Sequence, residues 1–321
     1  MSFEKVAGVI CAGNISHDIL VRPVEEFRWG TNTWVEDYQE GMGGNGSNSS
    51  FAMATLGVPV RLLGMVGPDE RGDALLAKLS GAGADVSFVE RSAQPTTTTI
   101  VVINRAGNRL FFQRVGSSLE AFSRPTVFSP ELIRGFSHYH QANLYSLANL
   151  RRNSGAQMEA AKRAGLTTSI DTGWATDGRW VESLAPALPW SDLLFVNEEE
   201  AGMLTGESRP AAIALKLRSL GAGDILLKLG GRGCAVFRGG DEYHVPGFQV
   251  EAVDTTGAGD NFAAGFFSAL QRGLGWREAA EAANAVGAMC VERVGATNGV
   301  RSWDETRLWM SKARRGGSEP L

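Results

Sequence analysis

The chain has 321 residues, with 31 basic and 35 acidic side chains and a formal net charge of −4 at pH 7. This mild acidity argues against a nucleic-acid binder that works through bulk positive charge, and 43% apolar with 21% charged residues is typical of a folded globular protein. The 40 glycines show no collagen-like period, so they require backbone that turns tightly or comes close to a ligand.

Short apolar runs alternate with helical patterns along the chain. Strands are predicted at Val6–Ala12, Val60–Val66, Ser137–Ala142, Thr167–Asp171, Asp192–Asn197 and Asp224–Leu229. Helices are predicted at Ser47–Leu56, Gly72–Ser80, Ala156–Ala164, Ala211–Leu220, Gly259–Arg272 and Trp276–Val291. This alternation predicts an α/β domain with a mostly parallel sheet that is covered by helices on both faces.

Two segments interrupt the alternation. Thr31–Glu40 is polar and extended in character, and Thr96–Arg114 contains two β-rich runs around a four-residue turn with glycine, which predicts a hairpin. We expect a small antiparallel flap over one edge of the main domain, and such a flap is a candidate lid. The aromatic residues Trp29, Trp34 and Phe112 suit stacking on a ligand, packing within the flap or a dimer contact.

Polar residues and glycines follow several predicted strands, where an open parallel sheet binds its ligands. They are Asn14, Asp18, Asp69, Asn143, Asp171, Asn197, Glu200, Gly230 and Gly231. Each one alone is as well suited to a turn or a helix cap, but together they predict a crevice. Within one of these strands His138 and His140 could share a face as metal ligands; a third ligand is not evident, which favours a core or surface role. Gln141 is a candidate for substrate contact.

The segment Asp254–Asn261, with the sequence Asp-Thr-Thr-Gly-Ala-Gly-Asp-Asn, runs directly into an apolar helix. The backbone N–H groups of Gly257, Ala258 and Gly259 at a helix N-terminus form an anion site that suits a phosphate. The carboxylate of Asp260 would repel that phosphate, so it is better suited to take a proton from an attacking hydroxyl as a general base. The alternative is a glycine turn with an aspartate cap.

A second glycine-rich segment matches the GxGxxG pattern at Gly41, Gly43 and Gly46, with Asp69 at a suitable distance for a ribose-binding acid. An NAD-dependent oxidoreductase is therefore an alternative. The context argues against it, because the preceding run is the polar flap and not a buried first strand. Close approach of the backbone to a polyhydroxylated ligand is favoured, with Asn48 donating hydrogen bonds from the first helical turn.

Cysteine usage and hydropathy indicate the compartment. Cys11, Cys234 and Cys290 are far apart and form no CxxC pair, which suits a reducing compartment and a role as small apolar fillers. No apolar run approaches the roughly 18 residues of a membrane span. We therefore expect a cytoplasmic protein with neither a membrane nor a nucleic-acid partner.

These motifs resemble the ribokinase (PfkB) family of sugar and nucleoside kinases, and the resemblance covers essentially the whole chain. Val253–Gly265 resembles the second signature of the family, and Gly43–Asn48 resembles the first signature. Many family sequences carry lysine at the position of Asn45, and this departure leaves one charge fewer near the substrate, which weakly disfavours a phosphorylated sugar.

The resemblance implies a ribokinase-like three-layer αβα sandwich with a mostly parallel central sheet and a small β-sheet lid. It implies one domain over residues 1–321, with the lid inserted at about 19–41 and 96–116. In this family the lid often also mediates dimerisation, so a homodimer formed through the lid is expected.

The resemblance also assigns roles to individual residues. Substrate-binding residues are implied at Asn14, Asp18, Gly43, Gly44, Asn48 and Gln141. Nucleotide-binding residues are implied at Asn197, Lys228, Gly230, Gly231, Gly257, Gly259 and Asn284. Glu200 would organise Mg²⁺ through water, and Asp254 and Thr256 fall where many members bind a monovalent cation. The implied cofactors are ATP and Mg²⁺, with K⁺ as a further candidate.

The implied activity is ATP-dependent phosphorylation of a hydroxyl of a small sugar, with Asp260 as the general base. A nucleoside kinase is the near alternative, because the four-residue spacing of Asn14 and Asp18 resembles that of adenosine kinases more than that of ribokinase. A non-catalytic sensor on the same fold is disfavoured, since a protein that only binds its ligand has no need of Asp260.

Overall fold

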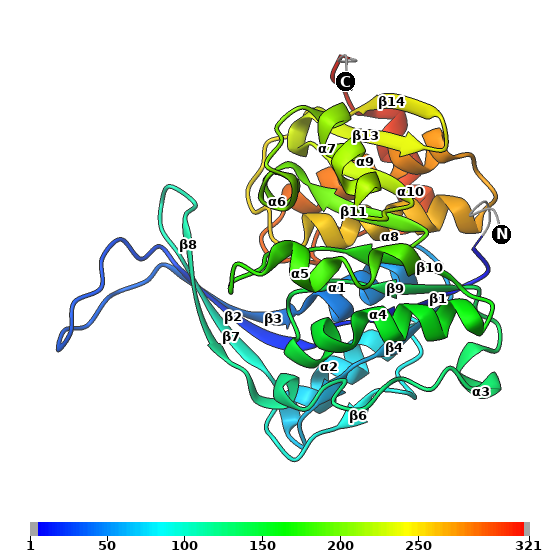
Figure 1. The fold of residues 1–321 in the computed structure, drawn as a ribbon. Helices are drawn as coiled ribbons and strands as arrows, with labels where there is room; N and C mark the ends of the chain where they lie inside the picture. Colours follow the sequence, from blue (N-terminus) through cyan, green and yellow to red (C-terminus); the bar gives the residue numbers. More distant parts are fainter. Residues whose placement is uncertain (1–5, 318–321) are drawn as a thin grey trace.

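An eight-stranded sheet runs through the middle of the molecule, of which the computed structural model describes residues 6–317 (Figure 1). Its strands are β1 (Val9–Ala12), β4 (Val60–Leu63), β9 (His138–Gln141), β10 (Thr167–Asp171), β11 (Leu193–Asn197), β12 (Asp224–Lys228), β13 (Gly233–Arg238) and β14 (Asp241–Pro246). Their order is β14-β13-β12-β11-β10-β9-β1-β4, parallel from β12 to β4, with β13 and β14 antiparallel at one edge. Residues 1–5 and 318–321 of the expected domain lie outside the described residues.

Helices cover both faces of this sheet (Figure 1). One face carries α1 (Asn45–Thr55), α2 (Glu70–Gly81), α8 (Ala258–Gln271), α9 (Trp276–Val291) and α10 (Trp303–Lys312). The other face carries α3 (Pro130–Ile133), α4 (Ala148–Arg163), α5 (Trp180–Leu184), α6 (Glu198–Thr205) and α7 (Pro210–Ser219). The predicted three-layer α/β fold is therefore confirmed. Within the described part of the chain, no helix has both the length and the apolar character that a membrane span requires.

The strands supply both hydrophobic cores by alternation. In β11, Leu193 and Phe195 face the core under α8 and α9, whereas Leu194 and Val196 face the core under α4 to α7. Because both faces are covered, β1, β11 and β12 are mainly apolar runs rather than alternating ones, whereas β9 and β10 also carry buried polar side chains. This is why these strands were recognisable in the sequence.

Other elements differ from the prediction. The run predicted as one strand at Val60–Val66 divides at Gly64: β4 stays in the central sheet, whereas β5 (Met65–Val66) pairs with β6 (Glu90–Arg91) in a separate two-stranded sheet. A Cβ on Gly64 would lie 2.8 Å from the Ile15 side chain, so the chain turns where only glycine fits. Helix α4 begins eight residues before its predicted start, and α6, α10, β13 and β14 were not predicted.

The lid is a four-stranded sheet that projects away from the central domain (Figure 1). Its strands β2 (Ser16–Arg22), β3 (Asp37–Gly43), β7 (Thr98–Ile103) and β8 (Arg109–Arg114) lie in the order β3-β2-β7-β8. The predicted hairpin is present as β7 and β8. The expectation of a purely antiparallel flap is wrong, because β2 and β7 pair in parallel.

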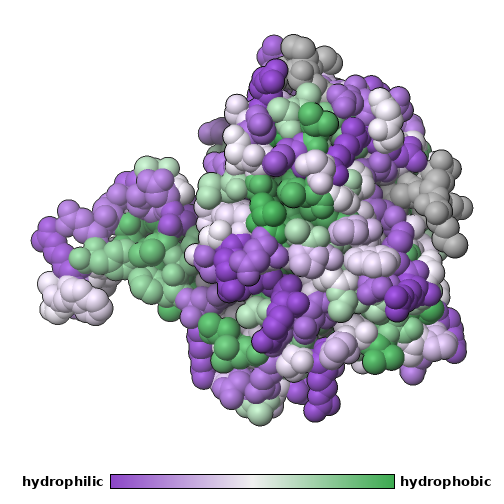
Figure 2. All heavy atoms as spheres, in the orientation of Figure 1, coloured by the Kyte–Doolittle hydropathy of each residue, from purple (hydrophilic) through white to green (hydrophobic). Residues whose placement is uncertain are grey.

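The two faces of the lid differ. Leu20, Val101 and Ile103 pack together with Val294, so this face looks toward the central domain. The opposite face exposes apolar side chains, and Figure 2 shows apolar surface on the projecting sheet.

Short 3₁₀ turns at Gly116–Leu119, Leu188–Trp190 and Gly230–Arg232 complete the connections.

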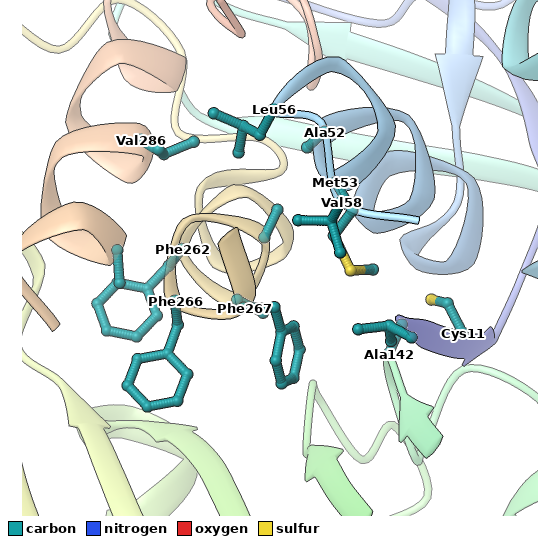
Figure 3. Packing of buried hydrophobic residues seen from close by; sticks show 14 of the residues in the cluster. Cys11, Ala52, Met53, Leu56, Val58, Ala142, Phe262, Phe266, Phe267 and Val286 are labelled. Atoms are coloured by element: carbon teal, nitrogen blue, oxygen red, sulfur yellow. The ribbon is translucent and has the colours of Figure 1, made fainter. Parts of the chain in front are cut away.

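Helix α8 lies between α1 and α9 and is buried on most of its circumference (Figure 3). Phe262, Phe266 and Phe267 from this helix pack in the core beside the central sheet. Gly265 lets α8 approach α9 closely, because a Cβ there would lie only 2.7 Å from the carbonyl oxygen of Ala282. This contact fixes the position of the helix that carries the predicted base.

Gly265→Ala should therefore destabilise the protein by about 1–3 kcal/mol, because the added methyl overpacks a rigid helix–helix contact. The matched control is Gly287→Ala in α9, where a Cβ would lie no closer than 3.5 Å to the carbonyl oxygen of Ala258. There the better helix propensity of alanine predicts no loss, or a gain of about 0.5–1 kcal/mol. Urea unfolding of both variants measures the difference; equal stabilities would contradict the packing argument.

Candidate active site

Polar side chains converge where the central parallel strands end at their carboxyl termini and α8 begins. Asp171 ends β10, Asn197 ends β11 and Lys228 ends β12, while Asn143 follows β9. Neighbouring parallel strands bring their carboxyl ends to the same edge of a sheet. The predicted crevice is therefore formed by residues that lie far apart in the sequence.

The first turn of α8 presents free amides to this crevice. Gly257 immediately precedes the helix and has φ +75°. Its carbonyl accepts a hydrogen bond from Asn261 N–H at 2.9 Å. The N–H groups of Gly259 and Asp260 have no acceptor among the residues described, whereas Ala258 N–H donates to the Thr255 carbonyl at 3.3 Å. Unpaired amides and the helix dipole together form an anion site.

Only glycine fits at the start of this helix. A Cβ on Gly257 would lie 2.6 Å from the Cβ of Ala296, and its positive φ is unfavourable for other residues. A Cβ on Gly259 would lie 3.1 Å from the Nζ of Lys228. The ammonium group of Lys228 is thus placed directly beside the free amides.

The carboxylate of Asp260 is held by two asparagines of α1. Asn45 Nδ2 donates to one oxygen at 2.9 Å, and Asn48 Nδ2 donates to the other at 3.0 Å. Asn143 Nδ2 donates in turn to Asn45 Oδ1 at 2.9 Å, which orients the amide of Asn45. The Oδ1 atom of Asn48 is buried without a partner among the described residues, which marks it as an acceptor for a ligand.

The environment of Asp260 makes it a much weaker acid than usual. Its side chain is 4% exposed, and burial raises its pKa from 3.8 to about 7, although the hydrogen bonds from Asn45 and Asn48 lower it. The nearby charge of Asp171 raises the pKa further. A carboxylate with a pKa near the working pH is suited to exchange protons.

Lys228 is the positive charge of the cluster. Its Nζ lies 2.8 Å from both carboxylate oxygens of Asp171. Burial disfavours the charged form of Lys228, but Asp171 and Glu200 outweigh it and raise the pKa above the usual value. Burial raises the pKa of Asp171 to about 6 despite the adjacent lysine. At neutral pH the pair is therefore ionised.

Asn197 and Glu200 form the capping box of α6. Asn197 Oδ1 accepts from Glu200 N–H at 2.8 Å, and Glu200 Oε2 accepts from Asn197 N–H at 3.1 Å and from the hydroxyl of Thr172 at 2.7 Å. This cap fixes the buried carboxylate of Glu200 at the edge of the sheet, near Asp171 and Lys228. Its hard oxygen donors suit Mg²⁺ held through water.

The expected substrate residues meet at the base of the lid. Asn14 Oδ1 accepts from the hydroxyl of Ser118 at 2.6 Å, and a Cβ on Gly44 would lie 2.5 Å from the carbonyl of Asn14. A Cβ on Gly43 would lie within 1.9 Å of the carboxylate of Asp18. Burial raises the pKa of Asp18, although hydrogen bonds from Ser16 and Thr99 oppose this shift.

The expected nucleotide residues are placed differently from one another. Gly230 and Gly231 lie in an open turn after β12, where a Cβ on either residue would meet nothing within 4 Å. Asn284 lies in α9 and is buried, with its Nδ2 donating to the carbonyls of Val245 and Pro246 at 3.0 and 3.2 Å. Its donors therefore tie α9 to β14, and a nucleotide could reach only its oxygen.

The interpretation of Gln141 as a substrate contact needs correction, and the structure agrees with the sequence context in disfavouring the GxGxxG alternative. The side chain of Gln141 does not reach the cluster: it lies on the α4 face of the sheet, where it accepts from Ser154 at 2.6 Å. The GxGxxG segment follows the lid strand β3 rather than a strand of the central sheet, and Asp69 caps α2 by accepting from Gly72 N–H at 2.9 Å. A dinucleotide site requires a strand of the central sheet before the glycines and an acidic residue that is free to bind the ribose, and the structure provides neither here.

The histidine pair belongs to the core. His138 and His140 both contact the hydroxyl of Ser169, at 2.7 and 2.8 Å, and both rings lie against Phe267. Burial lowers the pKa of His140 to about 3, so it is neutral. Residues 6–317 contain no group of three or more His, Cys, Asp or Glu side chains placed to hold a metal ion.

The expected monovalent-cation site is filled by protein groups. Asp254 Oδ1 accepts from the guanidinium of Arg109 at 2.7 Å and from the N–H and hydroxyl of Thr256 at 2.9 and 2.7 Å. Its Oδ2 accepts from Gly295 N–H at 2.8 Å. Both oxygens are engaged, so Asp254 and Thr256 do not fit the role of ligands for K⁺.

Sequence reasoning missed two residues of this site. Asn45 was noted only as a departure from lysine, yet it bonds directly to the carboxylate of Asp260. Arg109 was not singled out at all; it begins a lid strand, and nothing in its local sequence points to a partner 145 positions away. Only the position of Asn45 in the first glycine-rich segment could have signalled its role.

The fold and the anion site beside a buried carboxylate define a kinase of the ribokinase type. The chain belongs to the PfkB family of carbohydrate kinases, whose pattern matches residues 8–303. Members of this family are phosphotransferases that use a hydroxyl acceptor. The oxidoreductase alternative receives no support.

Individual relatives agree with this assignment. A 2-dehydro-3-deoxygluconokinase from Bacillus subtilis is 27% identical over 87% of this chain and 90% of its own length. An ATP-dependent ribose-1-phosphate kinase from Halopiger xanaduensis is 31% identical over 90% of this chain and 93% of its own. The structure of Arabidopsis thaliana ribokinase with ribose and ATP superimposes with a TM-score of 0.79 at 24% identity, covering 94% of this chain and 98% of that one.

The raised pKa of Asp260 predicts a pH-dependent cost to stability. Because its folded-state pKa of about 7 lies above the unfolded value of about 3.9, the protein loses stability as pH rises between these values. Asp260→Asn removes this ionisation. Relative to the wild type, the variant should gain about 2–3 kcal/mol more stability at about pH 8.5 than at about pH 5. Urea unfolding at both pH values measures these stabilities. If the variant differed from the wild type by the same amount at both pH values, the raised pKa of Asp260 would be contradicted.

Proposed function

We propose that the protein transfers the γ-phosphoryl group of ATP, bound with Mg²⁺, to a hydroxyl of a small neutral sugar. The observation that carries the proposal is the position of Asp260, in the first turn of α8 and hydrogen-bonded to Asn45 and Asn48 from the substrate-side helix. The carboxylate thus lies between the free amides of α8 and the residues that we expect to bind the sugar. The binding of ribose and ATP by the related ribokinase supports the same assignment.

Asp260 serves as the general base in this proposal. The acceptor hydroxyl displaces one of the asparagine donors, and the carboxylate takes its proton as the oxygen attacks the phosphorus. The asparagine that stays hydrogen-bonded keeps the carboxylate oriented. Asn143 supports Asn45 in turn, so the base cannot rotate away.

The anion site stabilises the charge of the transferring group. The free amides of Gly259 and Asp260 lie at the start of α8, and the ammonium of Lys228 lies beside Gly259. Donors fixed in this way do not reorganise during the reaction. Mg²⁺ held through water by Glu200 and Asn197 would supply further charge compensation to the phosphates, next to the open turn of Gly230 and Gly231.

The substrate residues favour a neutral polyol. Asn14, Asp18, Asn45 and Asn48 supply amide and carboxylate groups and no positive charge. Asp18 can accept from two adjacent hydroxyls of a furanose, and the unpaired Oδ1 of Asn48 can accept from a third. A phosphorylated or acidic sugar would meet the carboxylate of Asp18, and the side chains of Asn14, Asn45 and Asn48 carry no positive charge to offset it.

A panel of acceptors tests the proposed substrate class. ADP release with ATP–Mg²⁺ should be fastest with a neutral pentose or hexose and slow with sugar phosphates and keto-deoxy sugar acids. Nucleosides form the competing arm, because the spacing of Asn14 and Asp18 also suits a nucleoside ribose. Faster turnover of a nucleoside or an acidic sugar would overturn the choice of substrate while leaving the kinase chemistry intact.

Asp260→Asn should reduce kcat by about 10²–10⁴-fold, since it removes proton transfer but keeps the shape of the site. Binding of the best sugar, measured by calorimetry, should change little. In the wild type kcat/KM should rise with pH through the pKa of about 7, because only the ionised carboxylate accepts the proton. The control Asp241→Asn alters an exposed residue of β14 and should match the wild type. Near wild-type turnover of Asp260→Asn would contradict the mechanism.

We also propose that two copies associate through the outer face of the lid. Ile100, Leu110 and Phe112 share this face and are 39–49% exposed, and Phe27 stacks edge-on against Phe112. A contiguous apolar sheet face of this kind gains stability when a second copy covers it. The antiparallel register places all three side chains on one side.

Light scattering after gel filtration should therefore give twice the 34.3 kDa chain mass. Phe112→Asp should yield a monomer, because it places a charge in the apolar face. The control is Leu215→Asp on α7, an exposed leucine of the central domain, which should remain a dimer. A monomeric wild type would refute this interface.

A further inference from the structure

Arg109 connects the lid to the loop that precedes α8. It is the first residue of β8, and its cross-strand partner is Ile103, whose side chain packs toward Val294. Paired residues of an antiparallel sheet share a face, so Arg109 extends from the lid toward the central domain. Its Nη2 lies 2.7 Å from Asp254 Oδ1 and 3.1 Å from the hydroxyl of Thr255.

The contact is an ion pair between a buried carboxylate and a partly buried guanidinium. The side chains of Arg109 and Asp254 are 22% and 4% exposed, and Arg109 Nε has no acceptor among the described residues although it is buried. The charge of the guanidinium is therefore stabilised chiefly by Asp254. The ion pair of Arg105 with Glu36, by contrast, is exposed and stays within the lid. Removing one partner of a buried ion pair destabilises a protein strongly, whereas removing one partner of an exposed pair has little effect.

Asp254 in turn holds the loops on both sides of the anion site. Its backbone N–H donates to the Val291 carbonyl at 3.1 Å, and its Oδ2 accepts from Gly295 N–H at 2.8 Å. Gly257, three residues further on, packs against Ala296 of the same second loop. The carboxylate thus ties the residues before α8 to the residues that follow α9.

We propose that Arg109 is a positioning residue that acts as the protein's own cation at Asp254 and couples the lid to the anion site of α8. The guanidinium neutralises the buried carboxylate of Asp254, and the geometry of the first turn of α8 depends on this carboxylate. Because both oxygens of Asp254 are occupied by protein donors, activity does not require K⁺. The inference rests on the kinase activity of the family and on the placement of the anion site, but not on the identity of the sugar.

The same contact explains how the lid affects the phosphate end of the site. When the lid lies over the crevice, Arg109 places positive charge within the loop that delivers the free amides. When the lid moves away, the buried carboxylate of Asp254 loses its countercharge, which is unfavourable in a site shielded from water. Lid position and amide geometry are therefore linked through one side chain.

The test compares Arg109→Gln with Arg105→Gln, which removes a lid arginine whose ion pairs are exposed. In hydrogen exchange of the free protein, the amides of β7 and β8 should exchange about tenfold faster in Arg109→Gln and at the wild-type rate in Arg105→Gln. This readout needs no substrate, so it remains informative if the proposed sugar is wrong. Wild-type exchange rates in Arg109→Gln would contradict the proposed coupling of the lid to Asp254.

Kinetics separate positioning from simple lid packing. With the best acceptor of the panel, Arg109→Gln should lower kcat about 10- to 100-fold, with less than about a threefold change in the sugar KM. The wild-type rate should be the same in potassium chloride and in tetramethylammonium chloride of equal ionic strength. For Arg109→Ala, guanidinium chloride at a non-denaturing concentration should restore part of kcat. Activation of the wild type by K⁺, or wild-type kcat in Arg109→Gln, would overturn the proposal.

Discussion

The site depends on the fixed position of the N-terminus of α8. Close backbone packing holds it there: Gly265 lets the helix lie against α9, and Gly257 lets its first turn lie against Ala296. At both positions a Cβ would lie within 2.7 Å of a neighbouring atom, so a larger residue would displace the helix. The free amides, the ammonium of Lys228 beside Gly259 and the carboxylate of Asp260 are all placed relative to this one helix end.

Burying charge at that helix end sets the chemical character of the site. Asp171, Glu200 and Asp260 are buried around the single ammonium of Lys228, so the cluster has more negative than positive charge. Burial is the main reason why the pKa of Asp260 is raised, and the negative charge of Asp171 raises it further while Lys228 opposes the shift. At Asp254 the opposite balance holds, because Arg109 neutralises the carboxylate, and hydrogen bonds from Gly295 and Thr256 lower its pKa despite burial.

Much of the fold and part of the site could be predicted from the sequence, for identifiable reasons. The inner strands β1, β11 and β12 are mainly apolar because both faces are covered, whereas the edge strand β14 carries exposed charged residues and gave no strand signal. The two glycine-rich segments indicated Asp260 and Asn48 because they lie at helix N-termini. Gln141 was misplaced because successive side chains of a strand point to opposite faces, and composition does not say which face is which. The pairing of Arg109 with Asp254 joins the lid sheet to the loop that precedes α8, and no local pattern encodes it.

The hydrogen bond between Asn45 and Asp260 spans 215 positions of the chain. Its two ends come from helices α1 and α8, which pack side by side on the same face of the central sheet. During synthesis from the N-terminus, the lid and the sugar residues therefore emerge well before the base and the anion site. The site for phosphoryl transfer is therefore incomplete until the C-terminal third of the chain has been made.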